Sequence, residues 1–192
     1  MNEVVFLLEE PSMEVLLESL LPRIAPGSSY RLIAHEGRTD LQRSIPRKIK
    51  AWGGPANFVI VHDQHTHPDC RILKRTLVDL CNAARPQANF VVRIACTELE
   101  SWFLGDLKAI EIAYGLKGLS RRQSQAKFRD PDKLTNAAEI IQGLVPGYRK
   151  RRGAETIGPH LDIQNNQSSS FRLFVQTARL ALTPRLTGGH SS

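Results

Sequence analysis

Short apolar runs alternate along the chain with longer segments in which apolar residues recur every three or four positions. The apolar runs predict four β-strands, at residues 4–8, 30–35, 57–61 and 90–95. Strands that alternate with helical patterns are typical of βαβ units and a parallel sheet. The fold class expected is therefore α/β, with a mostly parallel four-stranded sheet flanked by helices.

The segments between the predicted strands have helical spacing. The first carries a leucine-rich stripe between residues 16 and 24, and Ser12 is predicted to cap its N-terminus. The second covers residues 41–52 and is expected to start or kink near Pro46. The third is predicted to begin at Asp69. Each of these helices would pack an apolar face on the sheet.

The strand pattern disappears after residue 97. Helices are predicted at residues 98–114, 131–145 and 169–182, with Trp102 and Phe103 in the core at helical spacing. We therefore expect an α/β core over residues 1–97 and a helical extension over residues 98–192, packed together as one domain. The basic run at residues 149–152 lies between predicted helices and is interpreted as a connection.

Composition and charge narrow the function classes. The 192 residues are 41% hydrophobic and 23% charged, as in globular proteins. No apolar run approaches the roughly 18–20 residues of a membrane span, and Glu3 stands where a secretory signal would be positive, so a cytoplasmic location without membrane contact is expected. The three cysteines lack CxxC spacing, which argues against a disulfide framework and a four-cysteine zinc site. A net charge of +7 favours a polyanionic partner such as nucleic acid.

Acidic residues follow three of the four predicted strands. Glu9 and Glu10 follow the first strand, Asp63 the third, and Glu98 and Glu100 the fourth. Because the carboxyl ends of parallel strands meet at one edge, these carboxylates are expected to converge there. Converging carboxylates suit a hard cation such as Mg²⁺ or Mn²⁺, which can activate water for phosphodiester cleavage. A simpler alternative is that Glu9 and Asp63 cap the helices that follow them.

These residues also carry a family resemblance. A strand ending in acid, then a helix, and a later strand ending in an Asp-x-Asp-like element resemble a Toprim catalytic domain. More narrowly, the chain resembles a bacterial family classed as a domain of unknown function, which is Toprim-like and often encoded beside an AAA-type ATPase in presumed anti-phage loci. The matching segments are Leu-Glu-Glu-Pro-Ser (8–12), His-Asp-Gln (62–64), Asp-Cys (69–70), Glu-Leu-Glu-Ser-Trp-Phe-Leu-Gly-Asp (98–106), Lys-Phe-Arg-Asp-Pro (127–131) and Pro-His-Leu-Asp (159–162).

In Toprim enzymes the first-strand glutamate acts as acid/base or metal ligand, and the Asp-x-Asp pair binds the cation. The resemblance therefore implies that Glu9 or Glu10 is catalytic and that Asp63 is the first Asp of the pair. His65 replaces the second Asp, and imidazole suits Mn²⁺ or Zn²⁺ better than Mg²⁺. Asp69 is expected to replace the missing carboxylate.

The resemblance also implies how the ligand set is completed and what the protein does. Glu98 and Glu100 would supply the remaining ligands to Mg²⁺ or Mn²⁺, with zinc less favoured. The predicted function is that of a metal-dependent nuclease component of a bacterial defence system. Its ATPase would be a separate AAA-type partner, since the chain has no Gly-x4-Gly-Lys-Ser/Thr run.

Residues near the C-terminal half are predicted to bind the nucleic acid. The candidates are Arg149, Lys150, Arg151, Arg152 and His160. Clustered cations would attract the phosphate backbone, and Tyr148 would stack on a base. The open alternative is that this basic run is a solvated loop.

Two other functions remain open. One is a non-catalytic subunit that binds nucleic acid or an ATPase through a degenerate site, which the His65 departure favours. The other is a metallo-β-lactamase-like hydrolase. His65, His67 and Asp69 resemble the His-x-His-x-Asp-His zinc motif, but Cys70 stands where its last histidine should be. That double-sheet fold needs two further histidines, and only His160 and His190 follow.

Overall fold

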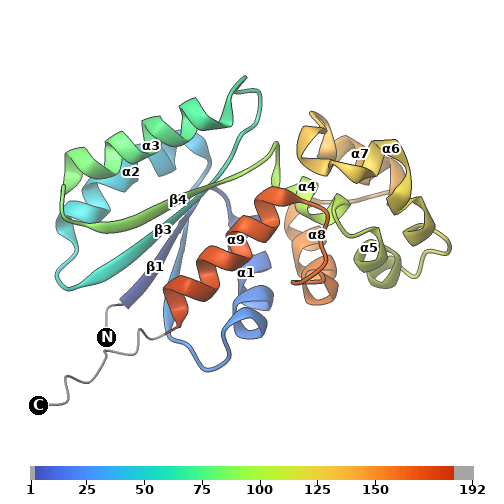
Figure 1. Cartoon of the computed structure of the whole chain (residues 1–192), viewed down its shortest axis with the longest axis horizontal. Coiled ribbons are helices and arrows are strands. Elements are labelled where there is room, and N and C mark those ends of the chain that lie inside the picture. Colours follow the sequence, from blue (N-terminus) through green and yellow to red (C-terminus); the bar gives the residue numbers. More distant parts are fainter. Residues whose placement is uncertain (1–2, 184–192) are drawn as a thin grey trace, which may run out of the picture.

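A computed structural model, which describes residues 3–183 of the chain, contains a four-stranded sheet with every strand parallel (Figure 1). The strand order is β2-β1-β3-β4. The strands are β1 (Glu3–Leu8), β2 (Tyr30–Ala34), β3 (Ala56–Asp63) and β4 (Asn89–Ala95). The α/β prediction is confirmed, and β3 runs two residues further than the apolar run indicated.

Helices cover both faces of the sheet. Helices α2 (Arg38–Ala51) and α3 (Cys70–Ala84) lie on one face, and α1 (Pro11–Ile24) and α9 (Ser169–Leu182) on the other (Figure 1). The side chains of β1 alternate between the two layers, as the two-residue period of a strand requires. Val5 and Leu7 pack with α2 and α3, whereas Phe6 and Leu8 pack with α1 and α9.

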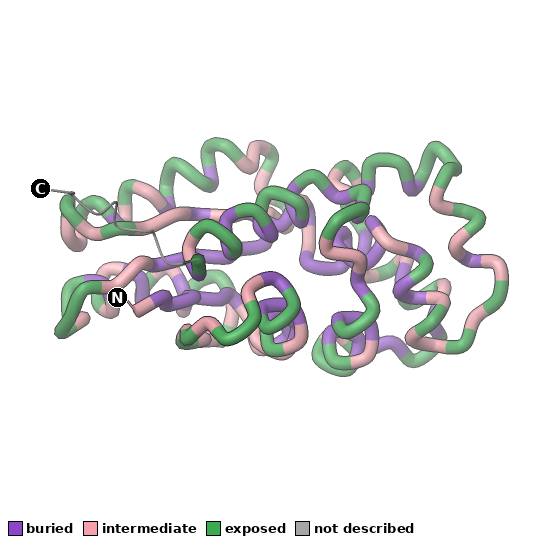
Figure 2. Tube along the Cα trace, turned by 60° about the horizontal axis from the view of Figure 1, so that its bottom comes forward, coloured by how far each residue is buried: buried purple, intermediate pink, exposed green. Residues whose placement is uncertain are grey.

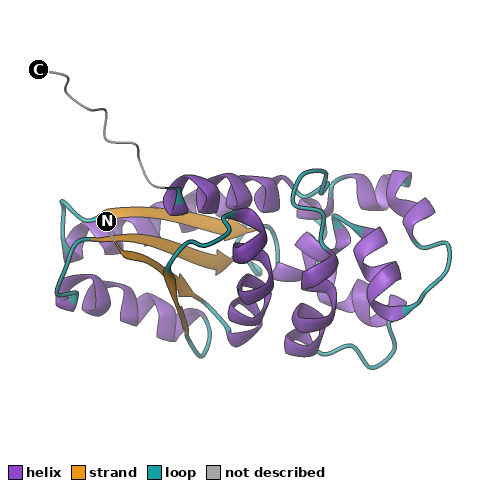
Figure 3. Cartoon of the chain, turned by 90° about the horizontal axis from the view of Figure 1, so that it is seen from below, coloured by secondary structure: helices purple, strands orange, loops and turns teal. Residues whose placement is uncertain are grey.

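The other helices lie beyond the carboxyl ends of the strands. They are α4 (Leu99–Leu104), α5 (Leu107–Tyr114), α6 (Ala126–Arg129), α7 (Ala137–Leu144) and α8 (Lys150–Ile157), with 3-10 turns at Ser120–Ser124, Pro131–Lys133 and Gly158–His160. Figure 3 shows the strand arrowheads pointing towards these helices. Trp102 and Phe103 are buried in a core shared with α1 and α9, which confirms their predicted place. The central strands β1 and β3 are mostly buried, whereas β2 has no buried residue. Figure 2 shows the outer turns of the helices exposed.

The predicted helix over residues 98–114 is two helices, which separate at Gly105 and Asp106. A Cβ on Gly105 would lie 2.0 Å from the side-chain oxygen of Asn166, so this close approach requires glycine. Asp106 then caps α5 by accepting a hydrogen bond from the backbone N–H of Ala109 at 3.1 Å. The helix predicted at 131–145 is similarly shorter, because it begins as a 3-10 turn and α7 starts only at Ala137.

Two local predictions were wrong and one was right. The basic run is not a connection, because Lys150 begins α8. Ser12 does not cap α1, which starts at Pro11; its hydroxyl donates instead to the Glu10 carboxylate. Asp69 does cap α3, since its carboxylate accepts from the N–H of Arg71 at 2.7 Å.

Within residues 3–183, no helix is long and apolar enough to cross a membrane.

The position of α8 depends on a glycine. A Cβ on Gly153 would lie 2.1 Å from the buried ring of Tyr148, so Gly153→Ala should lower the free energy of unfolding by about 1–3 kcal/mol through overpacking. Gly143→Ala in α7 is the matched control, because nothing lies within 4 Å of the added Cβ. It should raise stability by about 0.5–1 kcal/mol. Urea denaturation of both variants measures the difference, and equal stabilities would contradict the packing argument.

Candidate functional site

Four carboxylates gather at the carboxyl edge of the sheet. Glu9 and Glu10 follow β1, Asp63 ends β3, and Glu100 lies in the first turn of α4, just after β4. Strands β1, β3 and β4 are neighbours, so their ends meet. Glu9, Asp63 and Glu100 are buried, with exposed fractions of 2%, 0% and 0%. These four predicted site residues are thus brought together in a place where charge is costly.

Glu9 uses both carboxylate oxygens within the protein. Its Oε2 accepts from the backbone N–H of Asp63 at 2.8 Å and lies 2.8 Å from Nδ1 of His62. Its Oε1 lies 2.5 Å from Nε2 of His65. Burial would raise the pKa of Glu9, but the hydrogen bonds and charges of the two imidazoles outweigh it and lower the pKa to about 2. Glu9 is therefore ionised and fully engaged, and it does not cap α1, whose N-cap residue is Glu10.

His62 completes this network and was not among the predicted site residues. Its ring is buried, and Nδ1 also lies 2.5 Å from the backbone carbonyl of Asp63. Because both neighbours of Nδ1 are acceptors, Nδ1 carries a proton. Nε2 lies 3.2 Å from the side-chain nitrogen of Gln42. One feature of the sequence indicates that His62 is buried, because it directly follows the apolar run of a buried strand.

The Asp63 carboxylate differs from that of Glu9, because it has no hydrogen-bond partner among the described residues. Both of its oxygens are buried. Burial raises the pKa of Asp63 well above its ordinary value, and the neighbouring charges of Glu10, Glu9 and Glu100 raise it further, against a smaller opposing effect of Lys150. Buried polar atoms without partners are uncommon and call for an explanation.

Lys150 is the cation of the cluster. Its ammonium lies 3.5 Å from both oxygens of Glu10 and 3.7 Å from Oε2 of Glu100. Burial would lower the pKa of Lys150, but the carboxylates of Glu100 and Glu10 outweigh it and raise the pKa. The Tyr148 hydroxyl donates to Oε1 of Glu100 at 3.0 Å. Tyr148 is only 2% exposed, so the prediction that it stacks on a base was wrong.

Three other predicted ligands have different partners. His65, the one non-glycine residue with positive φ (51°) among residues 3–183, contacts Glu9. The Asp69 carboxylate caps α3. Glu98 lies at the carboxyl edge, where its Oε2 accepts from the N–H of Ala138 at the start of α7, at 3.0 Å. These contacts explain where the side chains point, and their role as metal ligands stays a prediction.

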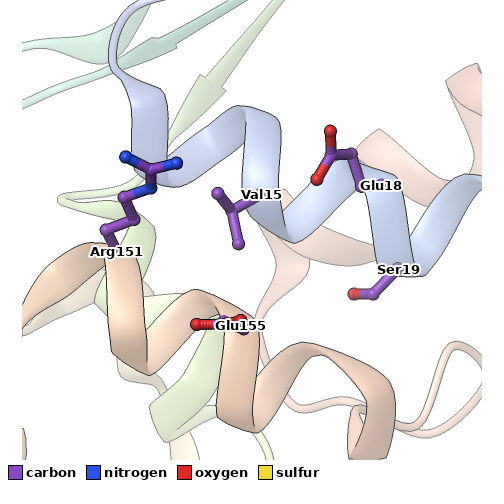
Figure 4. A pocket seen from close by; sticks show the side chains of 5 residues that line it. All are labelled: Val15, Glu18, Ser19, Arg151 and Glu155. Atoms are coloured by element: carbon purple, nitrogen blue, oxygen red, sulfur yellow. The ribbon is translucent and has the colours of Figure 1, made fainter.

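The predicted nucleic-acid residues divide into two groups. Lys150 enters the carboxylate cluster, whereas Arg149, Arg151, Arg152 and His160 are exposed. Figure 4 shows Arg151 at the start of α8, beside a groove between α1 and α8. The groove has a volume of about 380 Å³ and is lined by Val15, Glu18, Ser19, Arg151 and Glu155. The exposed side chains are free of the cluster, and their binding of nucleic acid stays a prediction.

No three His, Cys, Asp or Glu side chains within residues 3–183 lie in an arrangement that would hold a metal ion. Several carboxylate oxygens at this edge already have partners within the protein. Those of Glu9 face imidazoles, and the Glu10 and Glu100 carboxylates face Lys150. The unpaired oxygens of Asp63 are the exception, and Oε2 of Glu100 has no hydrogen-bond partner either. Carboxylate oxygens of this kind are ligands that Mg²⁺ and Mn²⁺ accept.

The raised pKa of Asp63 predicts a stability change with pH. The folded chain keeps a proton that the unfolded chain loses near the ordinary value of 3.8, so stability falls as pH rises from there through the raised pKa. Asp63→Asn removes this loss. In EDTA the variant should melt above the parent at about pH 8, and the gap should shrink at about pH 4. Calorimetric melting curves test this, and a gap independent of pH would show that Asp63 is not the titrating group.

Comparisons with known proteins give a family and no further relative. Searches of curated proteins and of solved structures found no match. A family model described as a domain of unknown function (DUF4276) matches residues 8–178, which include the carboxylate cluster and Lys150. Because the match covers most of the chain, this protein belongs to the DUF4276 family.

Proposed function

We propose that this protein is a Toprim-like, divalent-metal-dependent nuclease, in which Asp63, Glu10 and Glu100 hold Mg²⁺ or Mn²⁺. The observation that carries the proposal is the Asp63 carboxylate, which is wholly buried with two unpaired oxygens beside other carboxylates. Leaving a buried carboxylate unpaired costs several kcal/mol, and a coordinated cation removes that cost. Strongly shifted carboxyl pKa values in one cluster are also typical of functional sites.

The proposal gives each carboxylate a distinct role. Bound there, the cation would lower the pKa of a coordinated water and polarise a phosphoryl oxygen. Glu10 takes the role of the first-strand glutamate in Toprim enzymes, because both oxygens of Glu9 are engaged. Glu9 is then a positioning residue, which holds the end of β3 and the His65 ring.

Nucleic acid is the proposed substrate. The net charge of +7 and the exposed arginines at the start of α8 favour a polyanion. The family resemblance adds the finer proposal that the nuclease acts with an AAA-type ATPase in a defence system against phage. A separate ATPase is consistent with the absence of a P-loop motif from the sequence.

A non-catalytic binding subunit is the second candidate. It is favoured by the lack of a formed three-ligand arrangement within residues 3–183 and by the contacts of Lys150 with two of the carboxylates. A metallo-β-lactamase-like hydrolase has less support. The described residues form one parallel sheet, His65 contacts Glu9, and His190 lies outside the described residues.

Metal binding separates the nuclease from the binding subunit. Mn²⁺ should raise the melting temperature of the parent, with a stabilisation of about 2.7 kcal/mol at a hundred times Kd. Asp63→Asn should lose this increase and any Mn²⁺-dependent cleavage of single-stranded or duplex DNA. Asp79→Asn, which changes an exposed aspartate of α3, is the control and should behave as the parent. A folded Asp63→Asn protein with the full Mn²⁺ response would place the site elsewhere.

Nucleic-acid binding tests the exposed arginines. Changing Arg149, Arg151 and Arg152 together to Ala should weaken DNA binding in EDTA and reduce the slope of log affinity against log salt. Each phosphate contact contributes about 0.7–0.9 to that slope, so the loss should be roughly 2–3. The control changes Arg71, Lys74 and Arg75, which are exposed on α3, and should leave most of the slope. Equal slopes in both triple variants would mean that only net charge matters.

A further inference from the structure

Lys150 is the first residue of α8, and the other end of this helix is held against α1. Helix α8 packs closely on α1, where a Cβ on Gly158 would lie 2.5 Å from the Ser19 hydroxyl oxygen. The Arg23 guanidinium donates to the carbonyls of Gly158 at 3.1 Å and Leu161 at 2.6 Å. The Lys150 side chain is 39% exposed, so its ammonium lies at the boundary between the cluster and solvent.

The charges of the cluster balance with one divalent cation. Glu9 is compensated by its two imidazole partners and a backbone N–H. The three proposed ligands, Glu10, Asp63 and Glu100, carry three negative charges when ionised, and Lys150 supplies one positive charge. Glu98, whose charge also acts on Lys150, is not counted with them because its carboxylate accepts from the backbone N–H of Ala138. One divalent ion brings the sum to zero, whereas a second would leave an excess of positive charge. The positive charge of Lys150 thus compensates carboxylate charge that a second metal ion compensates in two-metal nucleases.

The contacts of Lys150 also place it in competition with a cation. Its ammonium lies within 4 Å of Glu10 and Glu100, which are two of the three proposed ligands. Two positive charges on the same oxygens repel each other in a site of low dielectric. The four-carbon stem of lysine allows the ammonium to turn towards solvent without movement of the backbone.

We propose that Lys150 is a tethered cation that neutralises the carboxylates until a divalent ion binds, and that it then binds the substrate phosphate. This inference rests on the proposed nuclease function and deepens it, because it assigns one metal ion and one lysine to an anionic phosphodiester. In the hydrolysis, a water oxygen forms a bond to phosphorus and the bond to the leaving oxygen breaks. The leaving oxygen ends with a proton from water, and the products are a phosphomonoester and a hydroxyl. Lys150 keeps its proton and contributes charge alone.

Lys150→Met tests both parts of the inference. In EDTA, the variant should melt below the control Lys108→Met, which changes an exposed lysine of α5, because the carboxylates lose their cation. By calorimetry it should bind Mn²⁺ about tenfold more tightly than the parent, since a like charge has been removed. The parent should bind one Mn²⁺ per chain. Cleavage of a DNA oligonucleotide at saturating Mn²⁺ should fall about a hundredfold or more. Lys150→Arg, which keeps the charge, should retain the affinity of the parent for Mn²⁺.

Each result has a distinct meaning. Equal melting of Lys150→Met and Lys108→Met in EDTA would overturn the counter-ion role. Unchanged or weaker Mn²⁺ binding by a folded Lys150→Met would overturn only the competition between Lys150 and the metal ion. Undiminished cleavage by this variant would overturn only the contact of Lys150 with the substrate phosphate. A parent that binds two Mn²⁺ ions would overturn the charge balance. A parent that neither binds Mn²⁺ nor cleaves would overturn the proposed function itself.

Discussion

The Glu9 carboxylate joins the ends of β1 and β3, and the geometry of the site depends on that junction. By accepting from the backbone N–H of Asp63, it fixes the last residue of β3 at the sheet edge. By engaging His62 and His65, it also orders the chain that leaves the strand. A carboxylate with several charge-assisted hydrogen bonds is stable when buried. This stability allows the neighbouring Asp63 to remain unpaired, because the backbone that carries it cannot turn away.

The cluster illustrates a balance between stability and function. An ordinary core would replace Asp63 and Glu100 with apolar residues of similar volume, since buried ion pairs seldom exceed such residues in stability. Here Glu10 and Glu100 instead share the Lys150 ammonium, which comes from a helix distant in the sequence, and Asp63 has no partner. Sites that keep such unfavourable charge usually do so because a ligand compensates it.

Local patterns predicted the sheet well, because each strand shows its own alternation or apolar run. The convergence of Glu9, Asp63 and Glu100 also followed, since parallel neighbours must end at the same edge. Contacts between distant residues could not be predicted in this way. Lys150 meets Glu10 across 140 positions, and no local signal marks that pairing. Helix α8 was missed because a basic run followed by Gly153 has low apolar content. Its packing depends on a distance that the sequence does not show, since Gly153 leaves room for the Tyr148 ring.

The path of the chain delays assembly of the protein during synthesis. Strand β1 is synthesised long before α9, yet Phe6 of β1 packs against Phe174 of α9, with 6.4 Å between the ring centroids. The Trp102 indole likewise donates to the hydroxyl of Ser170. Contacts that span nearly the whole chain form late. A nascent or truncated chain that stops before α9 therefore exposes to chaperones and proteases the apolar part of the sheet that α9 covers.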